Sequence, residues 1–139
     1  MAVARHNQEA MQNGGSLLRI EEANHSRGSL TASHATQLLI YEGNSDVPIA
    51  NVLFNGAAAN ADRMADRIEQ VTGGQGEVWQ STHQNDFVGK LIGGNAPTGG
   101  QTAGFGDAHS HYGPGVLEDE REEIWEASPT GSGNFSGRR

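Results

Sequence analysis

Residues 107–111 hold the densest group of side chains that could do chemistry in this chain of 139 residues. The segment reads Asp-Ala-His-Ser-His. A serine flanked by small residues is typical of a nucleophile elbow, in which the serine stands on a sharp strand-to-helix turn. Ser110 is therefore a candidate nucleophile, although no run of strand-forming residues precedes it. A serine nucleophile needs a base, and His109 and His83 are the candidates for that role.

The same segment supports a second hypothesis, a metal site. His109 and His111 alternate, so on an extended segment both would point to one side, with Asp107 two residues before them. Two histidines and a carboxylate could hold zinc or another divalent ion with an open coordination position. A third hypothesis is a solvated loop, because His and Ser are frequent in polar loops. A serine mechanism without cofactor, a metal-dependent hydrolase or nuclease, and a non-catalytic loop all stay open.

The elements that must position these residues are clearest between residues 48 and 94. An apolar run at 49–54 and a second run at 77–81 predict two strands, and residues 60–71 carry apolar side chains at the spacing of one helix face. A parallel pair of strands needs a crossover of about this length. The pattern predicts an α/β fold with a small or incomplete, mostly parallel sheet and flanking helices. Ligands usually bind where such strands end, which is where His83 lies.

Shorter patterns complete the expected organisation of the chain. Residues 38–41 read as a further strand and residues 86–92 as a short second helix. Residues 1–35 are polar and are expected to form a flexible N-terminal segment. Residues 36–115 are expected to form the α/β core with a glycine-rich loop, and residues 116–139 an acidic helix and a disordered tail.

Composition excludes some classes of function. The formal net charge is −8, so the chain is not built to bind a nucleic-acid backbone through bulk charge. Cysteine is absent, which excludes disulfides and thiolate zinc sites. No apolar run reaches the length of a membrane span, and no signal peptide is expected at the N-terminus.

Several motifs, taken together, resemble the C-terminal region of bacterial filamentous-haemagglutinin-type proteins of two-partner secretion, some of which have an α/β-hydrolase-like layout. The match covers about residues 48–115. The motifs that carry it are Asn55-Gly56 after a strand, Asn60 opening an alanine-rich helix, and the segments 81–89, 92–100 and 109–115.

The resemblance implies a secreted or cell-surface origin and a toxin-like or effector-like module, hydrolytic in some relatives. It places Ser110 where a hydrolase-like relative would have its nucleophile, and it implies a cognate immunity or partner protein. The alternative is a non-catalytic structural or association module. A sheet edge free to pair with another chain would then allow a homo-oligomer.

Overall fold

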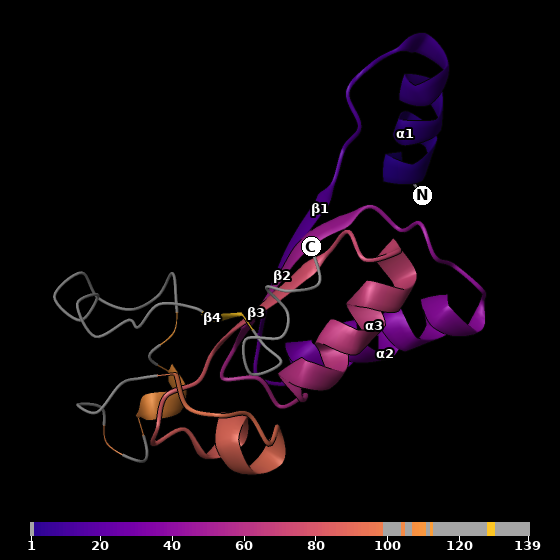
Figure 1. Cartoon of the computed structure of the whole chain (residues 1–139). Helices are drawn as coiled ribbons and strands as arrows, with labels where there is room; N and C mark the ends of the chain where they lie inside the picture. The colour runs from indigo at the N-terminus through magenta and orange to yellow at the C-terminus, as the bar shows by residue number, and fades with distance from the viewer. Residues whose placement is uncertain (1, 99–103, 105–106, 111, 113–127, 130–139) are drawn as a thin grey trace, which may run out of the picture.

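The computed structural model describes residues 2–98, 104, 107–110, 112 and 128–129 (Figure 1). Three strands alternate with helices along most of this range. In chain order the elements are α1 (Ala2–Asn13), β1 (Ile20–His25), α2 (Gly28–Tyr41), β2 (Ile49–Asn55), α3 (Ala61–Thr72), β3 (Glu77–Ser81), the π-helix η1 (Val88–Ile92), the 3₁₀ turn η2 (Ala108–Ser110) and β4 (Ser128–Pro129).

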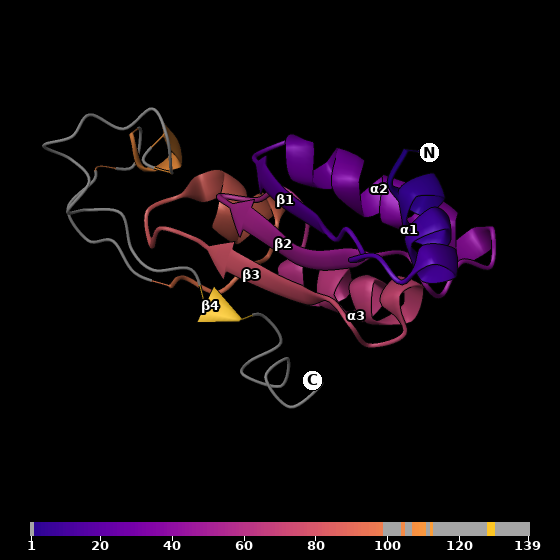
Figure 2. The same ribbon diagram turned by 90° about the horizontal axis from the view of Figure 1, so that it is seen from above.

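Strands β1, β2 and β3 form a parallel sheet in that order, and β4 pairs antiparallel with β3. His25 is in register with Asn55, and Asn55 with Ser81, so the three parallel strands end level. Helices α2 and α3 join successive strands and pack side by side on one face of the sheet (Figures 1 and 2). The predicted α/β fold with a small, mostly parallel sheet is confirmed.

Helix α3 forms as its pattern predicts. The Asn60 side chain caps it by accepting a hydrogen bond of 3.0 Å from the Arg63 N–H. At the other end Gly73 adopts a left-handed φ of 62°, a conformation that glycine reaches without strain. The apolar face of α3 packs on the sheet, and the side chains with no exposed surface in this layer are Val52, Phe54, Met64, Ile68, Val71 and Val78.

The loop between β2 and α3 is buried and tied to two distant parts of the chain. The Asn95 side chain accepts from the first N–H of α3 at 2.8 Å and donates to the carbonyls of Ala57 and Ala59 at 3.1 and 3.0 Å. The Ser29 hydroxyl, on α2, accepts from the Ala59 N–H at 3.0 Å. These bonds fix the loop relative to the start of α2.

The strand predicted at residues 38–41 is wrong, because these residues form the last turn of α2. Leu39 and Ile40 pack against the core, whereas Leu38 and Tyr41 are 61% and 79% exposed. An apolar run of four residues is too short for its periodicity to distinguish a strand from a helix. Tertiary packing decides between helix and strand here, because two of the four side chains contact the core and the other two face solvent.

Residues 1–35, expected to be flexible, contain α1, β1 and the first turns of α2 in the structure. The short helix predicted at 86–92 is confirmed as η1. Most of the expected acidic helix and tail lies outside the described residues, which include only β4 from that region. No helix in the described part of the chain is long and apolar enough to cross a membrane.

Candidate active site

The three parallel strands end at the same edge of the sheet, and polar residues follow them there. Ser26 comes directly after β1, and Thr82 and His83 come directly after β3. Segments 83–89 and 107–112 supply two further polar groups, Asp86 and His109, which meet at this edge. In open α/β sheets this is the edge at which ligands bind.

Ser26 occupies the turn between β1 and α2. Its φ is 52°, and it is the one non-glycine residue with a positive φ in the described part of the chain. Such a conformation costs roughly 1 to 2 kcal/mol and persists only where the surroundings over-determine it. A strained serine between a strand and a helix is the geometry of a nucleophile elbow.

Hydrogen bonds on both sides of Ser26 hold this turn. Its N–H donates to the Asn55 carbonyl at 3.3 Å. Its carbonyl accepts from the N–H of Ser29 at 3.2 Å, from the Ser29 hydroxyl at 2.6 Å and from the N–H of Ala58 at 3.2 Å. Because Ser29 lies on α2 and Ala58 in the β2–α3 loop, these hydrogen bonds hold the strained turn to both the helix and the loop.

Asp86 and His109 form a hydrogen-bonded pair beside this edge. The His109 Nδ1 lies 2.9 Å from the Asp86 Oδ1. An ionised carboxylate can only accept, so Nδ1 carries the proton and a neutral His109 has its Nε2 lone pair available. The Asp86 side chain is fully buried, whereas that of His109 is 27% exposed. A buried acid that orients a partly exposed imidazole is the arrangement of a general base and its orienting group.

Four donors converge on the Asp86 carboxylate. Besides His109, the N–H groups of Val88 and Gly89 donate to Oδ1 at 2.8 and 3.1 Å, and the Tyr112 hydroxyl donates to Oδ2 at 2.7 Å. Burial by itself raises the pKa of this carboxyl. The hydrogen bonds from Tyr112, Gly89 and His109 outweigh burial and hold the Asp86 pKa below its ordinary value, so Asp86 is ionised at neutral pH.

This depressed pKa predicts an acid-dependent loss of stability. A carboxyl whose pKa is lower in the folded chain stabilises the fold above its unfolded pKa of about 3.9, and this contribution is lost as the pH falls through the folded value. We expect the difference in free energy of unfolding between the wild type and Asp86→Asn to shrink as the pH is lowered from 6 towards 2. Urea unfolding at several pH values measures it, and a difference independent of pH would contradict the ionised state of Asp86.

His25, the last residue of β1, connects this pair to Ser26. Its ring stacks on that of His109 with centroids 4.7 Å apart and planes inclined by 29°. Its Nε2 donates to the His109 carbonyl at 2.8 Å. His109 is therefore held against the residue that directly precedes Ser26. Ser26 Oγ and His109 share no described hydrogen bond, and nucleophile and base are often further apart in free enzymes than in complexes with substrate.

The three catalytic candidates predicted from the sequence, Ser110, His83 and His109, have different environments in the structure. Ser110 is exposed on η2 and follows no strand, so it does not stand on the predicted strand-to-helix turn. His83 is fully buried, and its Nδ1 accepts from the Asn85 N–H at 2.9 Å. Only His109 takes the position of a base, and it pairs with Asp86.

The metal hypothesis receives no support from the described residues. Asp107 is exposed, and His111 lies outside the described residues. Within the described ranges no group of three or more His, Cys, Asp or Glu side chains could hold a metal ion. His109, a member of that proposed set, already has its Nδ1 engaged with Asp86.

Sequence reasoning missed both Ser26 and Asp86. Residues 24–28 read Asn-His-Ser-Arg-Gly, which is the elbow pattern with asparagine in place of its first glycine. The alternation of β1, in which every second residue is partly buried, was the available signal for a preceding strand. Asp86 stood in the sequence as the first residue of the short helix that becomes η1, where an acid is an ordinary capping residue.

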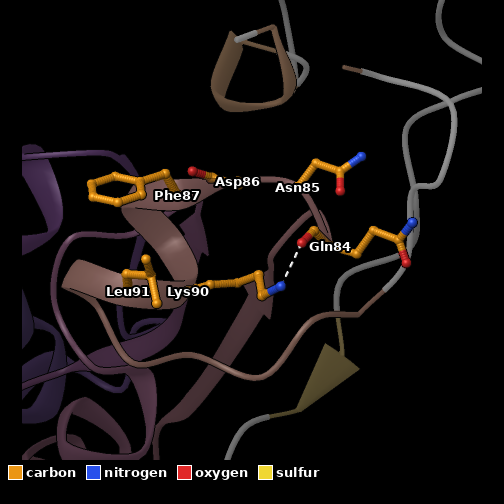
Figure 3. A pocket seen from close by; sticks show the side chains of 6 residues that line it. All are labelled: Gln84, Asn85, Asp86, Phe87, Lys90 and Leu91. Atoms are coloured by element: carbon orange, nitrogen blue, oxygen red, sulfur yellow. Dashed lines mark hydrogen bonds between the residues drawn. The ribbon is translucent and has the colours of Figure 1, made fainter. Parts of the chain in front are cut away.

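A shallow pocket of about 180 Å³ adjoins the Asp86 segment (Figure 3). Its lining consists of Gln84, Asn85, Asp86, Phe87, Lys90 and Leu91. Lys90 Nζ donates to the Gln84 carbonyl at 2.6 Å across it (Figure 3), and Phe87 and Leu91 remain 45% and 70% exposed. Neither Ser26 nor His109 lines this pocket, so it is a surface feature next to the site.

Comparisons with protein-family models, curated proteins and solved structures found no match. The resemblance to haemagglutinin-type C-terminal regions, with its secreted, toxin-like role and its immunity partner, therefore stays a prediction.

Proposed function

We propose that this chain is a serine-type hydrolase domain in which Ser26 is the nucleophile, His109 the base and Asp86 the group that orients the base. The observation that carries the proposal is a strained Ser26 turn whose preceding residue, His25, stacks on a His109 that is hydrogen-bonded to the buried Asp86. The order serine, acid, histidine along the chain is that of α/β-hydrolases. A strand, the serine turn and a helix precede the acid, as in that fold.

In the proposed reaction, Ser26, His109 and Asp86 each have one role. His109 Nε2 takes the proton of the Ser26 hydroxyl as its Oγ attacks the carbonyl carbon of an ester, thioester or amide. Asp86 stabilises the imidazolium that forms. His109 then gives the proton to the leaving group, and a water molecule, activated in the same way, releases the acid and restores Ser26.

The turn at Ser26 also provides one hydrogen-bond donor for the oxyanion, the negatively charged substrate oxygen that forms when the serine attacks. In a nucleophile elbow the N–H of the residue after the serine points at the developing negative charge. That residue is Arg27, and its N–H makes no hydrogen bond to another described residue. The first turn of α2 adds the partial positive charge of a helix N-terminus at the same place. Together these groups favour charge build-up on the substrate oxygen.

Labelling with a fluorophosphonate probe tests the proposal, because the probe reacts with activated serines. We expect the wild type to be labelled, Ser26→Ala to lose labelling and the matched control Ser110→Ala to retain it. Circular dichroism confirms that each variant is folded. Two results would overturn the proposal: no labelling of folded wild type, which favours the non-catalytic module, or labelling that depends on Ser110 and survives in Ser26→Ala.

A further inference from the structure

Tyr112 and His109 lie three positions apart in the chain, and both donate hydrogen bonds to the carboxylate of Asp86. The Tyr112 hydroxyl donates to Asp86 Oδ2 at 2.7 Å, while His109 Nδ1 donates to Oδ1 at 2.9 Å. Each oxygen of Asp86 therefore receives one side chain from this segment. A carboxylate held at both oxygens cannot rotate about its terminal torsion without losing a bond.

The Tyr112 hydroxyl is itself fixed by a second bond. It accepts from the backbone N–H of His83 at 2.7 Å. Because His83 follows β3, this bond connects the segment to the end of the sheet independently of Asp86. A hydroxyl with its donor and acceptor roles both filled points in one direction only, and that direction is towards Asp86.

The Tyr112 ring fills the space between the segment and the strand ends. A Cβ added to Gly56, after β2, would lie 2.6 Å from Tyr112 Cε2, so the ring rests directly on this glycine. The ring centroid also lies 5.6 Å from that of His25 and 6.5 Å from that of His109. Tyr112 thus contacts the groups that follow or end all three parallel strands.

We infer that Tyr112 is a positioning residue that fixes the Asp86 carboxylate and the segment carrying His109 in the geometry needed for proton transfer. This inference rests on the proposed hydrolase function. Tyr112 touches neither the nucleophile nor the reacting atoms in this role. It acts through Asp86, because partners outside the reacting groups set the orientation of those groups.

Tyr112→Phe tests the inference, since phenylalanine keeps the ring on Gly56 and removes only the hydroxyl. We expect the maximal rate of fluorophosphonate labelling to fall about 10- to 100-fold, with the probe concentration for half-maximal rate within about twofold. The Asp86 pKa should also rise, because the bond from Tyr112 lowers it. Carbon-13 NMR of the Asp86 carboxyl follows that titration without requiring activity.

Tyr41→Phe is the matched control, because Tyr41 is the other tyrosine of the chain and is 79% exposed at the end of α2. Its labelling rate and Asp86 titration should equal those of the wild type. In this variant Tyr112 is also the one phenol left. Burial and the bond to Asp86 raise the Tyr112 pKa, so its absorbance change on ionisation should come above the ordinary value of about 10.

The outcomes separate this inference from the proposed function. A folded Tyr112→Phe with unchanged labelling and an unchanged Asp86 titration overturns the inference alone. If Tyr112→Phe does not fold, a Tyr112 phenol that ionises at the ordinary pH in Tyr41→Phe overturns it. A shifted Asp86 titration in a chain whose wild type is never labelled supports the positioning of Asp86 and overturns the serine mechanism.

Discussion

Asp86→Asn should lower the rate of serine acylation roughly 10³- to 10⁴-fold while leaving the fold in place. The physical reason is the loss of the negative charge that stabilises the His109 imidazolium. Asparagine has nearly the same shape, and its carbonyl oxygen can still accept from the Val88 and Gly89 N–H groups that now bond Oδ1. Its amide nitrogen would then face the Tyr112 oxygen, which accepts from the His83 N–H and has a second lone pair for this donor.

The measurement is the second-order rate of fluorophosphonate labelling at neutral pH, with Asp46→Asn as the control. Asp46 is exposed in the α2–β2 loop at the opposite end of the sheet. This change removes the same unit of charge without touching the site, so labelling should stay within about twofold. Equal losses in both variants would show that overall charge, and not the His109 pair, governs the reaction.

Gly56→Ala should destabilise the chain by roughly 3 kcal/mol or more, which combines a left-handed backbone with overpacking. The glycine has a φ of 50° and lies against the Asp86 carboxylate. An added Cβ would stand 2.5 Å from Asp86 Oδ2 and 2.6 Å from Tyr112 Cε2. Both neighbours are held by hydrogen bonds, so neither can move without breaking the support of His109.

Gly43→Ala separates the two contributions, and urea unfolding measures both. Gly43 has a φ of 79°, but an added Cβ would meet no atom within 4 Å. It should therefore cost only about 1 kcal/mol, the backbone part. The excess loss in Gly56→Ala reports the clash with Asp86 and Tyr112. Equal losses in the two variants would contradict the tight packing of the site.

The central β-α-β unit could be predicted because its local signals agree with its packing. The apolar side chains of β2 and β3 that belong to the core are buried, and α3 has a cap, an amphipathic face and a glycine stop. β1 lacks such a run because it is the strand at the end of the sheet. Glu21, Ala23 and His25 share the face of the sheet opposite the core and are exposed, which gave residues 20–25 the appearance of a polar segment.

The site could be predicted only in part, since its residues meet through contacts that sequence spacing does not encode. His109 was predicted as a base, but for Ser110, its neighbour in the chain. Its structural partner Asp86 lies 23 positions away. The serine at the elbow was hidden by Asn24 in the place of a glycine and by the polar strand before it. The cluster of His and Ser at 107–111 led to the prediction of Ser110 as the nucleophile, but such residues are also frequent in ordinary polar loops.

The placement of the three groups along the chain has a consequence for biosynthesis. Ser26 takes its strained turn from contacts made within the first sixty residues, and Asp86 joins the sheet edge after β3. The base comes later, on a segment whose described ties to the edge include side-chain bonds from His25, Asp86 and Tyr112. A ribosome-bound chain that has released the sheet but not residue 109 would carry a formed nucleophile turn without its base. The proposed site would thus be completed only after His109 and Tyr112 have left the ribosome, later than the sheet edge on which it is built.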